Sequence, residues 1–151
     1  MTQPAPDLWF SFVRAHRCLI REIERRLAEQ QLPPYAWYDA LWGIESGAEG
    51  ERRMHELADV MAIERYNLTR LVDRLEKDGL VQRLKAQGDG RGAIARITDE
   101  GRALRKRMWK VYKQAVDQLF LAEFDEAQQR AFASALEGAA CNARLGDQER
   151  P

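Results

Sequence analysis

The residues best suited to binding chemistry lie in a basic stretch between positions 65 and 107. This stretch holds 12 Lys and Arg residues against 6 Asp and Glu, although the 151-residue chain has 24 of each and no net charge. The flanking segments are acidic, with 7 basic and 11 acidic residues in 1–64 and 5 and 7 in 108–151. Because clustered positive charge attracts phosphates, this pattern indicates a localised nucleic-acid interface.

One predicted helix, at about residues 66–78, carries side chains that could read DNA. Arginine matches the O6 and N7 atoms of guanine, asparagine matches adenine, and threonine and tyrosine can hold phosphates. Any one of these arginines could instead belong to a solvated helix face, but the set as a whole favours DNA contact. The candidates are Arg65, Tyr66, Asn67, Thr69, Arg70 and Arg74.

A second candidate contact lies in a glycine-rich segment that follows this helix. Alternating residues predict two short strands, at about 80–86 and 93–97, and residues 87–92 between them contain three glycines. We therefore expect a hairpin whose tip presents Asp89 and Arg91. An arginine at such a tip is suited to the narrow, strongly negative minor groove.

The elements that must position these residues form a winged helix-turn-helix. Apolar spacing predicts helices at 7–30, 35–45, 54–62 and 66–78, a long helix from Thr98 to about 122, and a last helix after Asp125. The turn between the third and fourth helices is so short that they must cross steeply. We expect a mainly α fold (α+β with a small β-hairpin wing), in which 35–97 bind DNA.

The terminal helices predict a second chain as a partner. Residues 1–34 and 98–151 form amphipathic arms that a small central module would leave poorly covered. Two chains that interleave these arms would bury their apolar faces. We therefore expect N- and C-terminal dimerisation helices and a homodimer.

Several motifs resemble those of the MarR family of bacterial transcription regulators, and the order of the elements extends the resemblance over about 7–145. Glu56-Leu57-Ala58 opens the first helix of the motif. The run 68–76 (LTRLVDRLE) is followed by 78–81 (DGLV), by the wing 89–91 (DGR) and by 97–102 (ITDEGR).

The resemblance implies a sequence-specific DNA-binding transcription regulator, a homodimeric repressor released by a small, often aromatic ligand. Its partners would be a pseudo-palindromic double-stranded operator and a second copy of the chain. The recognition helix would read the major groove, and Arg91 would reach the minor groove. Two departures matter: Gly90 replaces an arginine usual in the wing, and the run 64–67 (ERYN) stands where small residues are common. The second departure suggests a distinct base preference that involves Tyr66 or Asn67.

Aromatic residues on three predicted helices form a candidate effector pocket. The resemblance places them near the ligand site of the family, and an apolar pocket with few polar groups is typical of such sites. His16, Asp39 and Arg17 are the candidate polar anchors that lie nearest in the sequence. The alternative is ordinary packing in the core or at the dimer interface. The candidates are Trp9, Phe12, His16, Trp37, Asp39, Trp42, Met108 and Tyr112.

Other functions find little support. Cys18 and Cys141 have neither a CxxC nor a zinc spacing, so we interpret them as reduced thiols, with a redox sensor as the alternative. His16 and His55 alone cannot form a metal site, and no catalytic motif, and hence no enzyme or cofactor, is indicated. The absence of a signal peptide and of an 18-residue apolar run predicts a cytoplasmic protein without membrane contact. A winged helix that binds a protein instead of DNA is the second hypothesis.

Overall fold

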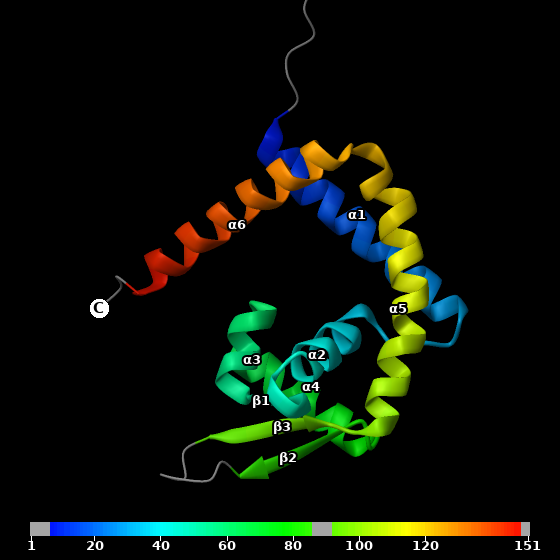
Figure 1. Ribbon diagram of the computed structural model, residues 1–151, viewed down its shortest axis with the longest axis vertical. Helices are drawn as coiled ribbons and strands as arrows, with labels where there is room; N and C mark the ends of the chain where they lie inside the picture. Colours follow the sequence, from blue (N-terminus) through cyan, green and yellow to red (C-terminus); the bar gives the residue numbers. More distant parts are fainter. Residues whose placement is uncertain (1–6, 86–91, 149–151) are drawn as a thin grey trace, which may run out of the picture. The chain divides into compact units, whose positions relative to one another are not determined.

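The computed structural model describes residues 7–85 and 92–148. These residues form two compact units, which are divided between Lys113 and Gln114. The predicted wing contacts Asp89 and Arg91 lie outside the described residues. Figure 1 shows the elements in chain order, which are α1 (Leu8–Glu29), α2 (Tyr35–Glu45), β1 (Glu51–Arg53), α3 (Met54–Met61), α4 (Arg65–Lys77), β2 (Val81–Lys85), β3 (Ala93–Ile97), α5 (Asp99–Leu119) and α6 (Glu126–Gln148).

The sheet has three antiparallel strands in the order β1-β3-β2, whereas the sequence predicted only a two-stranded hairpin. The missing strand is β1, which pairs Glu51 with Arg96 and Arg53 with Ile94 of β3. Three residues are too few to show the alternation that marks a strand, so only the pairing reveals it. With this correction, the expected mainly α winged helix is confirmed.

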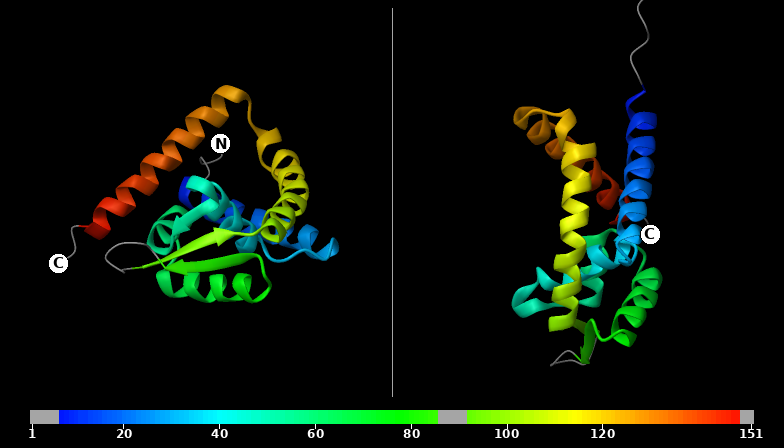
Figure 2. Two further views of the ribbon diagram at one scale, coloured as in Figure 1. Left: turned by 60° about the horizontal axis from the view of Figure 1, so that its bottom comes forward. Right: turned by 90° about the vertical axis from the view of Figure 1, so that its right-hand side faces the viewer.

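The winged helix is held together by one apolar core. Ala62, in the left-handed conformation at φ 52°, ends α3 and allows the tight turn into α4. Figure 2 shows α4 running along the β2–β3 hairpin. Fully buried side chains from α2, α3, α4 and the strands meet between these elements, and they include Leu41, Ile44, Leu57, Leu68, Val72, Leu75, Val81 and Ala95.

Two glycines and a threonine fix the passage from α4 through the hairpin to α5. Gly79 adopts φ +74° and ends α4, as its position predicted, and the Leu80 amide donates to the Leu75 carbonyl at 2.9 Å. The Thr98 hydroxyl donates to the Gly79 carbonyl at 2.7 Å and accepts from the Gly101 amide at 3.1 Å. Thr98 therefore caps α5 and ties the end of the recognition helix to the start of the next one.

The second compact unit contains the end of α5 and all of α6. Asp125 and Gln128 form the predicted capping box, in which each side chain accepts from the backbone amide of the other at 2.9–3.0 Å. Phe132 and Leu136 on α6 are exposed. None of the described helices combines the length and the apolar character that crossing a membrane requires.

Candidate nucleic-acid interface

Helix α4 presents a buried face and an opposite polar face. Leu68, Leu71 and Leu75 lie in the core. At 3.6 residues per turn, Tyr66 and Arg70 fall on the side directly opposite these leucines, and both are exposed. The polar face that the sequence assigned to DNA therefore points away from the core.

The other predicted contacts of α4 lie on its two flanks. Asn67 and Arg74 are exposed on one flank. Arg65 and Thr69 lie on the other flank, where the Thr69 hydroxyl donates to the Arg65 carbonyl at 2.9 Å. The six candidates on α4 are therefore all exposed, but they face three directions and cannot all contact the same groove edge.

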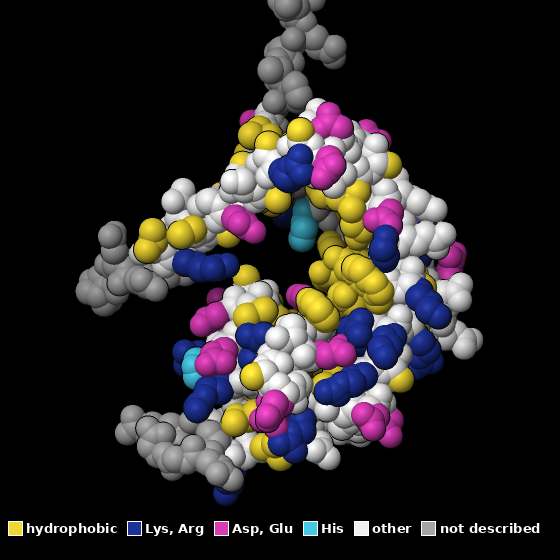
Figure 3. Space-filling view, in the orientation of Figure 1, with side chains coloured by type: hydrophobic (Ala, Val, Ile, Leu, Met, Phe, Trp, Pro, Cys, Tyr) yellow, Lys and Arg dark blue, Asp and Glu magenta, His cyan; other side chains and the backbone are white. Residues whose placement is uncertain are grey.

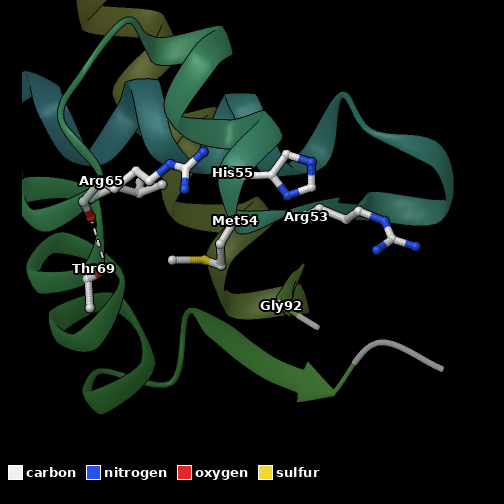
Figure 4. Close-up of a pocket in the computed structure, with 7 residues that line it drawn as sticks. Arg53, Met54, His55, Arg65, Thr69 and Gly92 are labelled. Carbon is white, nitrogen blue, oxygen red and sulfur yellow. Dashed lines mark hydrogen bonds between the residues drawn. The ribbon is translucent and has the colours of Figure 1, made fainter. Parts of the chain in front are cut away.

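An open groove of about 530 Å³ adjoins this second flank (Figure 4). Leu68 and Met54 supply its apolar lining, while Arg65 extends from α4 toward His55 at the start of α3. The complete lining is Arg53, Met54, His55, Arg65, Leu68, Thr69 and Gly92. The groove is thus lined by two arginines, Arg53 of β1 and Arg65 of α4, and by His55 of α3.

Arg53 and His55 of this groove are not among the DNA-binding residues that the sequence predicted. Arg53 ends the unpredicted strand β1, and His55 lies in the first turn of α3. Both are exposed. The signal that could have found them is their position directly before and within the first helix of the motif.

Part of the basic stretch is committed to ion pairs within the chain. Arg83 pairs with Asp73 at 2.6 Å, and Arg96 of β3 pairs with Glu51 on the neighbouring strand. Arg105 pairs with Glu45 of α2. Figure 3 shows Lys and Arg side chains spread over the winged helix. Those held in such pairs stabilise the fold, and the count of charges in the sequence could not distinguish them from side chains available to bind DNA.

Aromatic side chains of α2 and α5 form a packed cluster. The Tyr38 ring contacts both Tyr112 and Trp109, with ring centroids 4.9 and 5.8 Å away, and Tyr35 contacts Tyr112 at 5.2 Å. Figure 3 shows hydrophobic side chains gathered where α2 faces α5. Asp39 of α2 is half-buried, and its burial raises the pKa of its carboxyl above the ordinary 3.8.

The structure joins some of the predicted effector residues and separates others. Tyr112 belongs to the aromatic cluster, Met108 is fully buried, and Trp37 is half-buried. Trp42 is exposed beneath the Arg105 guanidinium, which lies 5.6 Å from its ring centroid.

The predicted effector residues of α1 do not belong to the aromatic cluster of α2 and α5. Trp9 and Phe12 contact each other at 6.1 Å and are exposed, as is His16. Among the described residues, no ring contact links Trp9 or Phe12 to the cluster of α2 and α5.

The described residues include no group of three or more His, Cys, Asp or Glu side chains that could hold a metal ion. Cys18 and Cys141 are both free thiols and are exposed.

Comparison with known structures identifies the fold. Sco3205, a MarR family transcriptional regulator from Streptomyces coelicolor solved in complex with DNA, superimposes on this chain with a TM-score of 0.82. The two are 30% identical, and the match covers 88% of this chain and 86% of that one. The chain belongs to the MarR family. The MarR family model matches residues 33–92, which include α2 to β2.

Two further proteins resemble this MarR-family chain, one in sequence and one in structure. The homoprotocatechuate degradative operon repressor of Escherichia coli is 40% identical over 65 residues, which span 43% of this chain and 44% of that protein. AbsC, a MarR family regulator from Streptomyces coelicolor, shares the fold with a TM-score of 0.83 at 22% identity, over 95% of this chain and 99% of AbsC. MarR family members are transcription regulators, which confirms that the chain is not an enzyme.

Proposed function

We propose that this MarR-family chain is a sequence-specific, homodimeric DNA-binding repressor of a pseudo-palindromic operator. The observation that carries the proposal is the groove beside α4, which Arg53, His55 and Arg65 line from three elements. In this proposal, α4 enters the major groove of the DNA, and the sugar-phosphate backbone of one DNA strand runs along the cationic groove on the protein. The relative Sco3205 was solved with DNA, which supports this assignment.

The starts of α3 and α4 fit phosphates for a second reason. Neither the Arg53 side chain before α3 nor the Glu64 side chain before α4 accepts a hydrogen bond from the first amides of its helix. Such amides and the positive end of the helix dipole attract anions. Phosphates of a DNA backbone bound along the groove would accept hydrogen bonds from these amides, which no side-chain cap engages.

The homodimer rests on apolar surface at the two ends of the chain. Trp9 and Phe10 on α1 are exposed, as are Phe132, Leu136 and Leu145 on α6. Burying such residues against a second copy would be strongly favourable. We accordingly assign 1–34 and 98–151 to dimerisation, 35–97 to DNA binding, and the protein to the cytoplasm, where its operator would be.

Repression released by a small aromatic ligand completes the proposal. The curated relative represses a homoprotocatechuate degradative operon, and aromatic rings here line the junction of α2 and α5 beside Asp39. The effector residues proposed from the sequence remain candidates for this site. A thermal-shift screen of aromatic acids, phenols and purines tests it, because a ligand of the folded state raises the melting temperature.

Salt-dependent binding to DNA from its own upstream region tests the central proposal. Contact with roughly 6–10 phosphates should lower affinity about 10³–10⁵-fold between about 50 and 200 mM salt. Arg91→Ala should weaken binding and reduce the salt slope by about one, if the wing tip contacts a phosphate. Absent or salt-independent binding would instead support a winged helix that binds a protein partner, and a stable monomer in sedimentation would contradict the homodimer.

A further inference from the structure

Tyr66 is an exposed aromatic residue at the start of the recognition helix. Its side chain is 68% exposed, although it lies in the first turn of α4, two residues before buried Leu68. The Arg70 guanidinium lies over its ring, with Cζ 5.2 Å from the centroid. This distance is within the range of a favourable cation–π contact.

Helix geometry places this pair on the side of α4 that lies opposite the core. The buried residues Leu68, Val72 and Leu75 define one side of the helix, and Tyr66 and Arg70 lie on the opposite side, four residues apart. If α4 lies in the major groove with its buried face turned away from the DNA, these two side chains point most directly at the base edges.

We propose that Tyr66 and Arg70 act as one base-reading unit, in which Arg70 donates to O6 and N7 of a guanine and Tyr66 positions its guanidinium. The inference rests on the proposed DNA binding by α4. A guanidinium stacked on a ring keeps its N–H edge free, and two parallel donors match guanine in the major groove. Stacking before DNA arrives also reduces the side-chain entropy lost on binding.

The same contact could serve only to stabilise the helix, as many pairs at positions i and i+4 do. Four full-length variants separate the two roles. R70K keeps the charge but loses the planar fork, and Y66F keeps the ring. Y66L removes the ring with a residue that favours helix, so loss of helicity does not explain its effect. K77Q removes a different cation from the same exposed side of α4, two turns further along, and serves as the control.

The experiment selects duplexes from a randomised DNA library with the wild-type protein and each variant, followed by affinity measurements at several salt concentrations. We expect the wild type to select a guanine in each half-site, with roughly 5- to 150-fold discrimination. R70K should lose this preference while its salt slope stays unchanged. Y66L should reduce the discrimination roughly 2- to 30-fold, and Y66F should retain it. K77Q should weaken affinity and leave the guanine preference intact.

The outcomes distinguish this inference from the proposed function. Unchanged base preferences in R70K, or in Y66L, would overturn the base-reading unit while leaving sequence-specific binding in place. A wild-type protein that selects no sequence would overturn both. Circular dichroism of each variant confirms that α4 and the rest of the fold are intact.

Discussion

Arg83 of β2 holds Asp73 of α4, with Nη1 of the guanidinium 2.6 Å from Oδ1 of the carboxylate. The same guanidinium donates through Nη2 to the Thr69 carbonyl at 3.0 Å, and the Arg83 amide donates to Glu76 at 2.9 Å. Three contacts from one residue therefore fix the wing strand against the recognition helix. Arg83 Nε has no hydrogen-bond partner among the described residues, which limits the net gain.

We predict that Arg83→Gln lowers the free energy of unfolding by about 1–2 kcal/mol, because it removes the ion pair and the bond to α4. In a double-mutant cycle with Asp73→Asn, the coupling energy should be about 0.2–1 kcal/mol, since both groups are partly exposed. DNA affinity should fall without a change in salt slope. A reduced slope would show that Arg83 contacts phosphate and would contradict the positioning role.

Arg53 offers the opposite signature. It lines the groove and is exposed, so Arg53→Ala should weaken binding to every DNA sequence and reduce the salt slope by about one. Lys110→Ala is the matched control, because it removes an exposed cation of α5 that does not line the groove. Titrations at several salt concentrations measure both slopes, and equal slopes for the two variants would remove Arg53 from the interface.

The difference between Arg83 and Arg53 also shows what could be predicted from the sequence. Helix spacing placed α4 and its exposed candidates correctly, since Leu68 and its partners mark a period of 3.6. Charge alone could not tell that Arg83 is bound to Asp73, because the two lie on different elements. Nor could it place Arg53 and His55 in a groove, since that surface exists only once the three elements pack together.

Gly101 has no room for a side chain because the backbone of Leu80, which is distant in the sequence, lies against it in the fold. An added Cβ at Gly101 would collide with the Leu80 backbone carbonyl and approach Ile97 Cγ1 to 2.8 Å. We predict that Gly101→Ala destabilises the fold by about 1–3 kcal/mol. Gly138→Ala is the control, because a Cβ there meets nothing within 4 Å and the position is helical, so it should stabilise by about 0.5–1 kcal/mol. Chemical denaturation measures both, and equal effects would refute the collision.

Glu45 and Arg105 join α2 to α5 through two hydrogen bonds, one of them Nη2 to Oε1 at 3.3 Å. Their side chains are only 18% and 13% exposed, so the pair is poorly screened by solvent. Glu45→Gln should lower the free energy of unfolding by about 1–3 kcal/mol, because Arg105 would keep its charge without a counterion. Glu126→Gln breaks the exposed pair with Arg130 and should cost at most about 0.5 kcal/mol. Similar losses in both variants would contradict the role of burial.

Asp39 gives a prediction for the pH dependence of stability. Burial raises the pKa of its carboxyl in the folded chain above the ordinary 3.8, so the folded state binds the proton more tightly than the unfolded state. The contribution of Asp39 to stability should therefore fall as pH rises from about 3.8 through the raised value, and the charged form should be destabilising at neutral pH. Asp39→Asn should match the wild type below this window and be more stable above it. Urea denaturation across the pH range checks this, and a stability difference that does not change with pH would show that burial of Asp39 is not its cause.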